Sequence, residues 1–143
     1  MTDDEFRRIL ADTRRIAVVG VSLKPERPSH RVTQWLVDMG YEVFPVNPGH
    51  AGRTVCGRPV AAGLGDLPRD IQMVDIFRSP EHVPAVVAEA LDLFPALETV
   101  WMQIGAGHPE AAAMARGRGV AAVMDRCPVI EHARLFGAAS APR

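Results

Sequence analysis

The sequence predicts an α/β protein of the Rossmann-like class, with a five-stranded, mainly parallel sheet and helices on both of its faces. Short continuous apolar runs, such as those at 16–19 and 120–124, are typical of parallel strands that are covered on both faces. Segments whose apolar residues recur at helical spacing alternate with these runs. Because alternating strands and helices form parallel sheets with right-handed crossovers, the pattern favours this class.

The chain opens with a predicted amphipathic helix. Thr2 and Glu5 have the spacing of a capping box, and the apolar stripe that follows ends near Thr13. A strand at 16–19 comes next and ends at Gly20, where the missing side chain lets the backbone approach a ligand closely.

The stretch after Gly20 is rich in turn residues and leads to a second helix, with Ser29 as its expected N-cap. Gly40 stands where a left-handed cap belongs, so the helix should end there. A second strand is predicted at 41–46. Because proline donates no ladder hydrogen bond, we place Pro45 at the carboxyl end of this strand, where pairing runs out.

The rest of the chain continues the alternation. The region 50–70 shows little periodicity, and we expect mostly loop there, with a short strand or turn near Val60 and a helical turn at Leu64. Three strands and three helices should follow: strands at 73–77, 99–104 and 120–124, and helices that begin at Ser79, at Pro109 and after Cys127.

Composition and charge narrow the class of protein. The 143 residues fit one domain, 1–143, with an N-terminal helix within 1–14 and a flexible tail at 137–143. A net charge of -1 gives no general attraction to nucleic acid or to an anionic membrane, and no apolar stretch could cross a bilayer. The acidic N-terminus is unlike a secretory signal, and two cysteines make no disulfide framework, which favours a reducing cytoplasm.

The carboxyl ends of parallel strands are where such folds bind ligands. Backbone N–H groups after Gly20 and the start of the next helix favour an anion, and Lys24 and Arg27 add positive charge. Arg31 opposes the helix dipole and Arg78 directly follows a strand, so both also indicate an anionic ligand. The alternative is a turn with solvated charges. Five segments should meet at this crevice: 21–27, 47–50, 77–79, 103–105 and 126–128.

NAD is the first candidate ligand for this architecture, but two features argue against it. The G-x-G-x-x-G fingerprint is absent after Gly20, and the second strand ends in Asn47 rather than in a carboxylate that would hold the ribose. A ligand with a further phosphate suits the nearby His50 and Arg53 better, because cations form charge-assisted bonds with phosphate. Two such ligands are NADP and coenzyme A (CoA) with its 3′-phosphate.

Five motifs follow one another between about Arg15 and Leu135. In chain order they are IAVVGVSLKPERPSHRV, YEVFPVNP, VDIFRSPEHVP, VWMQIGAGHPEAA and MDRCPVIEH. Together they resemble the small single-domain CoA-binding proteins, which are similar to the N-terminal CoA-binding domain of the succinyl-CoA synthetase alpha subunit. The resemblance implies a Rossmann-like fold with coenzyme A lying across the strand ends.

The resemblance also implies positions for the ligand. Where it would put a lysine beside the adenosine phosphates, this chain has His50, followed by Arg53, so phosphate affinity there would depend on pH. The expected contacts are Gly20, Val21, Ser22 and Lys24 for the phosphates, Asn47 and Pro48 for the adenosine part, Phe77, Arg78, Ser79, Gln103 and Ile104 after the next two strands, and Cys127 near the thiol.

Most of the remaining cysteine, histidine and tryptophan residues are expected to be structural, and the role of Cys127 stays open. Cys127 is either a reactive thiol beside Arg126 or a small buried group. The histidine and cysteine spacings match no metal site. We assign Trp35 and Trp101 to the core, His82 and His108 to the starts of helices, and His132 to the exposed surface.

Three classes of function remain open. No Ser-His-Asp set, carboxylate pair or P-loop lysine stands at interpretable spacing, which favours a module that binds CoA or an acyl-CoA without catalysis of its own. The second class is an enzyme, either an NADP-dependent oxidoreductase or a CoA transferase. The third is a docking subunit of an acyl-CoA ligase. The resemblance implies that ligation needs a further domain, so an ATP-grasp partner would have to act in trans. A homodimer also remains open.

Overall fold

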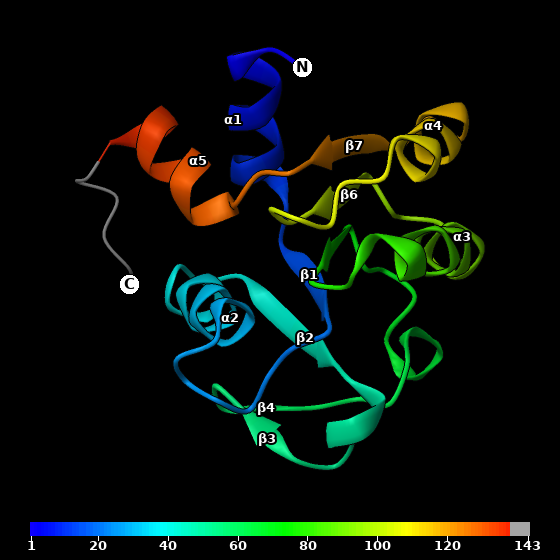
Figure 1. The fold of residues 1–143 in the computed structure, drawn as a ribbon. Coiled ribbons are helices and arrows are strands. Elements are labelled where there is room, and N and C mark those ends of the chain that lie inside the picture. Colours follow the sequence, from blue (N-terminus) through cyan, green and yellow to red (C-terminus); the bar gives the residue numbers. More distant parts are fainter. Residues whose placement is uncertain (138–143) are drawn as a thin grey trace.

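A central sheet of five parallel strands organises the molecule (Figure 1). The computed structural model describes residues 1–137 and has the strand order β2-β1-β5-β6-β7, in which all neighbours are parallel. The predicted Rossmann-like class is therefore confirmed. Of the predicted tail at 137–143, all but Gly137 lies outside the described residues. The strands are β1 (Arg15–Val19), β2 (Glu42–Val46), β5 (Met73–Ile76), β6 (Thr99–Met102) and β7 (Ala121–Met124).

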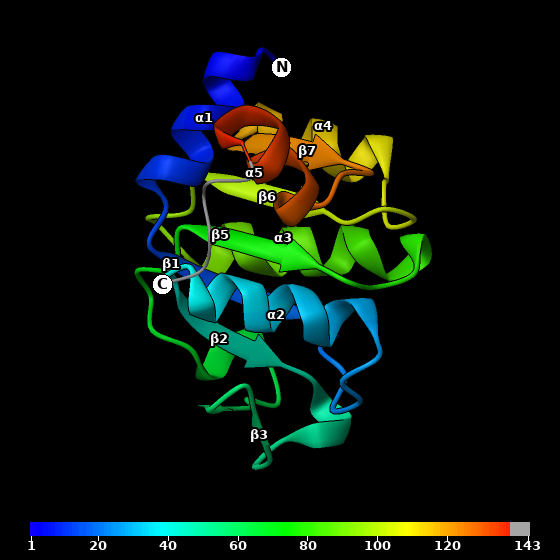
Figure 2. The ribbon, with the colours of Figure 1, turned by 90° about the vertical axis from the view of Figure 1, so that its left-hand side faces the viewer.

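Helices cover both faces of the sheet, as the sequence predicts. Figure 1 and Figure 2 show α1, α2 and α5 on one face and α3 and α4 on the other. A separate apolar cluster fills the space under each group, so every central strand is buried from both sides. The helices are α1 (Asp3–Asp12), α2 (Pro28–Asp38), α3 (Val83–Leu93), α4 (Pro109–Gly117) and α5 (Pro128–Phe136).

β5 shows why the strands read as continuous apolar runs. Its residues point alternately to the two clusters, Val74 and Ile76 toward α3 and α4, and Met73 toward the opposite face. Both faces are covered, so both sets of side chains are apolar. Asp75 is the polar exception and is fully buried.

The capping box predicted at the start of α1 is present. The N–H of Thr2 donates to Oε2 of Glu5 (2.6 Å), and the N–H of Glu5 donates to Oγ1 of Thr2 (3.2 Å). These bonds favour the ionised carboxylate and so lower the pKa of Glu5. On the buried side of α1, the Phe6 ring lies 6.0 Å from the ring of Trp101, whose predicted core position is confirmed.

The start of α2 differs from the prediction that Ser29 is its N-cap. The N-cap is Arg27, whose side chain makes no capping hydrogen bond, and the helix begins at Pro28. Proline is favoured at that position because the N–H that it lacks would have no helical partner. The Ser29 hydroxyl instead accepts a hydrogen bond from the N–H of Ser22 (2.9 Å), which ties the preceding loop to the helix. Gly40, with φ of 96°, follows the helix as predicted.

Pro45 lies near the carboxyl end of β2, as predicted, but pairing does not run out there, because Pro45 stands opposite Val18 of β1 and Val46 opposite Val19. β2 is an edge strand of the sheet. The Pro45 carbonyl accepts from the N–H of Ala61 on the outer side, while Val46 accepts from Gly20 on the β1 side. Because the N and C=O of a strand residue point to the same side, the donor that Pro45 lacks would have pointed away from β1. The proline therefore removes no bond from the sheet.

The region 50–70 contains the short strand expected near Val60, together with regular structure that was not predicted. β3 (Thr54–Val55) and β4 (Arg58–Pro59) form a small antiparallel hairpin, and Ala61 bridges to Val46 at the edge of β2. Strands of two residues are too short to produce a periodic sequence signal. The expected helical turn at Leu64 is confirmed as the 3-10 turn η2 (Leu64–Asp66).

β5 and β6 end one or two residues earlier than predicted, at Ile76 and Met102. Phe77, Gln103 and Ile104 therefore lie in the loops beyond the ladder, at the carboxyl edge of the sheet. The chain after β5 forms the 3-10 turn η3 (Pro80–His82) before α3, and the chain after β2 forms η1 (Pro48–His50).

Gly20 lies where the chain leaves β1 and passes close to the end of β5. It has φ of 89°, and a Cβ built on it would lie 2.2 Å from the carbonyl oxygen of Phe77. Two constraints therefore require glycine here, the left-handed backbone and the contact with a neighbouring peptide. The loop after β1 packs against the end of β5 because this position has no side chain.

We expect Gly20→Ala to lower the free energy of unfolding well beyond the cost of a left-handed alanine, because the carbonyl of Phe77 would have to move. Gly52→Ala is the matched control, since Gly52 has φ of 82° and nothing within 4 Å of its Cβ position. The control should cost about 1–2 kcal/mol, and Gly20→Ala about 1–3 kcal/mol more. Urea unfolding measures both, and equal losses would contradict the close approach.

Candidate ligand-binding cavity

A cavity of about 1100 Å³ opens at the carboxyl ends of the strands. It is lined by the segments that follow β1, β2, β5 and β6, together with one side of α2 and the start of α5. From β1 the chain runs outward to β2 at one edge of the sheet, and from β5 to β7 it runs outward on the other side of β1, so the strand order reverses between β1 and β5. Doubly wound proteins bind ligands at this switch point. The volume slightly exceeds the range of about 300–1,000 Å³ typical of small-molecule pockets.

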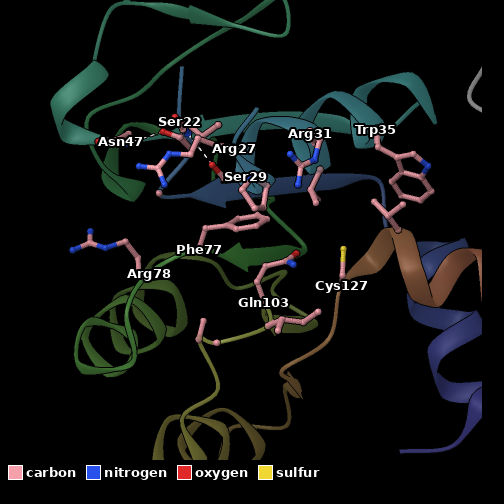
Figure 3. A pocket seen from close by; sticks show the side chains of 18 of the residues that line it. Ser22, Arg27, Ser29, Arg31, Trp35, Asn47, Phe77, Arg78, Gln103 and Cys127 are labelled. Carbon is pink, nitrogen blue, oxygen red and sulfur yellow. Dashed lines mark hydrogen bonds between the residues drawn. The ribbon is translucent and has the colours of Figure 1, made fainter. Parts of the chain in front are cut away.

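Asn47 and Ser29 hold the loop after β1 in place. Nδ2 of Asn47 donates to the carbonyl of Val21 (2.8 Å), and its Oδ1 accepts from the N–H of Gly49 (3.0 Å). Both ends of this amide are therefore engaged within the protein. Figure 3 shows Asn47, Ser22 and Ser29 together at one end of the cavity.

The same end of the cavity is positively charged. Three arginines line the cavity, Arg27 and Arg31 from α2 and its N-cap, and Arg78 from the segment after β5. Within residues 1–137, no aspartate or glutamate lines it. The start of α2 carries partial positive charge, and its N-cap side chain makes no capping hydrogen bond. Pro28 has no N–H and the N–H of His30 donates to the carbonyl of Arg27, so the N–H that the first turn offers to a ligand is that of Ser29. The charge distribution favours an anion.

Gln103 forms the buried middle of the cavity lining and is only 5% exposed. With its amide oriented so that nitrogen faces the neighbouring carboxylate, it donates to Oδ1 of Asp75 at 2.9 Å and to Oδ2 at 3.2 Å. Burial raises the pKa of Asp75 well above its ordinary value of 3.8. Gln103 is among the predicted contacts but Asp75 is not, because a lone aspartate in an apolar run gives no motif.

The opposite end of the cavity is apolar. Figure 3 shows Trp35 and Cys127 there, and Val129 and Ile130 line the cavity from the first turn of α5. Ile104 lines it from the loop after β6 and is 64% exposed, although its side chain is large and apolar.

Trp35 and His132 differ from their predicted environments. Trp35 is half-buried rather than in the core, and it lines the cavity. His132 is half-buried rather than exposed, with its ring 5.1 Å from that of Trp35 and 4.6 Å from that of Phe136. Burial lowers the pKa of His132. The edge-to-face contact between Trp35 of α2 and His132 of α5 explains both differences, because the sequence of one helix does not show which residue of the other it meets.

α5 is held in position by a buried carboxylate. Glu131 is 5% exposed and accepts from Arg126 (2.8 Å) and Arg134 (2.9 Å), and Arg134 also pairs with Asp3 of α1 (2.9 Å). The guanidinium of Arg126 also lies over the Phe6 ring of α1, 5.0 Å from its centroid. These contacts fix the segment that carries Cys127.

The cavity brings together most of the residues selected from the sequence. Lys24 and Pro48 are exposed and do not line it, and Arg53, also exposed, lies outside it. The selected residues that do line it are Gly20, Val21, Ser22, Arg27, Arg31, Asn47, His50, Phe77, Arg78, Ser79, Gln103, Ile104 and Cys127.

Sequence reasoning missed a set of lining residues on α2. Pro28, Val32 and Trp35 lie on the same helical face as Arg31. Counted from Pro28, the spacings are three residues to Arg31, four to Val32 and seven to Trp35. That periodicity was a usable signal, because it defines the side of the helix that faces the strand ends. Gly105 lines the cavity as well, within the predicted segment 103–105, whereas Ser29, Ala106, Val129 and Ile130 line it and were not selected.

Other kinds of site are not found in the part of the chain that the structure covers. Within residues 1–137, no group of three or more His, Cys, Asp or Glu side chains could hold a metal ion. No helix in the same range is long and apolar enough to span a membrane.

His108 stands at the start of α4, as predicted, and caps the helix: its Nδ1 accepts a hydrogen bond from the N–H of Ala111 (3.1 Å).

The fold and the cavity together define a doubly wound protein with a large cavity, lined by three arginines, at its switch point. Residues 14–133 match the family described as "CoA binding domain". The chain belongs to this family.

Similar proteins cover most of the chain. "Uncharacterized protein YneT" of Bacillus subtilis (strain 168) is 36% identical over 129 residues, which are 90% of this chain and 93% of YneT. The structure of "cell-free ID.343" from Thermus thermophilus has a TM-score of 0.88 and 38% identity, and the match covers 95% of this chain and 100% of that one. The dinucleotide forming acetyl-coenzyme A synthetase 1 of Ca. Korarchaeum cryptofilum, in complex with phosphate and ADP, has a TM-score of 0.67. With 19% identity, over 87% of this chain and 28% of that one, it shares the fold.

We expect Asp75→Asn to stabilise the protein increasingly as the pH rises. The pKa of Asp75 is higher in the folded state than the ordinary 3.8 of the unfolded chain, so the wild type loses stability between that value and its raised pKa. Asparagine has no proton to lose and can donate to Oε1 of Gln103. Urea unfolding across this pH range tests the difference, with Asp66→Asn as an exposed control. If the free energies of unfolding of the wild type and Asp75→Asn differed by the same amount at every pH, the raised pKa of Asp75 would be contradicted.

Proposed function

We propose that this protein binds coenzyme A or an acyl-CoA across the carboxyl ends of its parallel strands, without catalysis of its own. The observation that carries the proposal is a cavity at the switch point, lined by three arginines and the start of α2 with no opposing carboxylate among the described residues. Membership of the CoA binding domain family supports the same ligand.

The ligand's phosphates would lie at the end of the cavity next to Ser22, Arg27 and Arg78. Guanidinium groups suit phosphate because their N–H donors can form paired, charge-assisted bonds with its oxygens. The 3′-phosphate and adenosine would lie toward Asn47 and His50, at the turn after β2. Lys24 is exposed outside the lining and would contribute only longer-range attraction.

A binding role without catalysis is supported by how the reactive groups are distributed. Cys127 is the only cysteine, serine or threonine at the apolar end, and no carboxylate lines the cavity within residues 1–137. Cys127 lies at the opposite end of the cavity from Asn47 (Figure 3), and His50 belongs to the turn that follows Asn47. A nucleophile and a base must lie within hydrogen-bond reach of one another to act together.

NADP is the second candidate, because Asn47 rather than a carboxylate ends β2 and His50 and Arg27 line the same end of the cavity. A docking role in acyl-CoA ligation, with an ATP-grasp protein in trans, is a third candidate. The fold similarity to the much longer acetyl-coenzyme A synthetase chain supports it. We also propose a cytoplasmic location, and a homodimer as one form in which the protein would act.

We expect CoA to raise the melting temperature in proportion to the logarithm of its concentration, while NAD and NADP leave it unchanged. 3′-Dephospho-CoA should have a smaller effect than CoA, because one charged contact is lost. Differential scanning fluorimetry with the four ligands tests this. A larger shift with NADP than with CoA would favour the oxidoreductase alternative.

We expect Arg78→Ala to weaken CoA binding by roughly 10- to 150-fold, the equivalent of about 1.5–3 kcal/mol for a hydrogen bond to a charged group. Lys24→Ala should weaken it much less, because Lys24 does not line the cavity. Arg8→Ala, an exposed arginine on α1, is the control for net charge. Isothermal titration calorimetry measures all three variants, and equal effects would show that the cavity arginine has no specific contact.

A further inference from the structure

We propose that the apolar end of the cavity binds the acyl group of an acyl-CoA thioester, and that the preferred acyl group is an uncharged alkyl chain. This inference rests on the proposed function and adds the class of thioester that the site selects. It follows from the unequal distribution of charge along the cavity.

The charges of the cavity and of the ligand match in one orientation. Arg27 and Arg78 lie at the end marked by Asn47, and Arg31 lies between that end and Trp35 (Figure 3). In CoA, all phosphates belong to the nucleotide half, and the pantetheine arm that carries the thiol is uncharged. With the phosphates at the arginines, the arm extends past Gln103 toward Cys127. The thioester then lies at the apolar end.

Two large apolar side chains that line the cavity are more than half exposed, and an alkyl chain would cover them: Ile104 (64%) and Ile130 (55%). Ile104 follows Gln103 in the loop after β6, and Ile130 belongs to the first turn of α5, which follows Cys127. Val129 lines the cavity from the same turn, and Trp35 lies at the same end as Cys127 (Figure 3). Covering such apolar surface is favourable in proportion to the area removed from water.

Among the described residues, the same end offers no cationic side chain for a negatively charged acyl group. Within residues 1–137, the cations that line the cavity are Arg27, Arg31 and Arg78, none of which belongs to the loop after β6 or to α5. Arg126 precedes Cys127 but does not line the cavity, and it is paired with the buried Glu131 (2.8 Å). A carboxylate-terminated chain such as succinyl would therefore lose solvation without gaining an ion pair.

Titration calorimetry with CoA, hexanoyl-CoA and succinyl-CoA tests the inference. We expect hexanoyl-CoA to bind about tenfold tighter than CoA, the gain expected when roughly two methylene groups leave water. Succinyl-CoA should bind no tighter than CoA. The measured quantity is the ratio of the dissociation constants of CoA and hexanoyl-CoA, which separates the acyl contact from the binding of the nucleotide.

The double variant Ile104→Ser/Ile130→Ser should reduce this ratio to about one. Both side chains are more than half exposed, so the variant should fold, and circular dichroism checks that it does. Met114→Ser is the control, because Met114 is an exposed apolar residue of α4 that does not line the cavity. It should leave the ratio unchanged.

The possible failures are distinguishable. Absence of CoA binding would contradict the proposed function. CoA binding with equal affinity for hexanoyl-CoA, or an equal gain with succinyl-CoA, would overturn the acyl inference and leave the proposed function standing. A third outcome would also overturn the inference. The wild type would sediment as a dimer with a ratio of one, and the variant Ile104→Ser/Ile130→Ser would sediment as a monomer. The exposed residues would then form an interface between two copies of the chain.

Discussion

The contact between Gly20 and the Phe77 carbonyl determines the geometry of the whole binding edge. β1 and β5 are neighbours in the sheet, but the chain leaves them in different directions, toward α2 on one face and α3 on the other. The cavity forms between these two exits. A side chain at position 20 would meet the Phe77 carbonyl and separate the two loops. The hydrogen bonds from Asn47 to Val21 and from Ser22 to Ser29 then hold the loop in this position.

The loop geometry directs the start of α2 and its arginines toward the cavity. The result is a strongly localised electrostatic feature in a protein whose net charge is only -1. A local cluster of cations beside a helix N-terminus can select an anion without making the surface generally basic. The other end of the cavity, formed by α2 and α5, has no cationic side chain from α5 within residues 1–137. One cavity thus has a cationic end and an apolar end, and its polarity matches that of a phosphorylated nucleotide with an uncharged arm.

The strand pattern, the helix order and most cavity residues were predictable because parallel strands are buried on both faces and their ends converge. Contacts between distant segments were less predictable. Ser29 has the chemistry of an N-cap, but its hydroxyl is engaged by Ser22 across the loop. Pro45 fits inside its strand because that strand is at the edge. Trp35 and His132 meet only when α2 and α5 lie side by side, and the β3–β4 hairpin is too short to leave a pattern.

A crystal structure of the protein with coenzyme A tests the central claim most directly. The account predicts that the diphosphate lies at the N-terminus of α2, within hydrogen-bond distance of Ser22, Ser29 or Arg27, and that the thiol lies next to Cys127. Phosphates at the Trp35 end, or coenzyme A bound away from the strand ends, would contradict it.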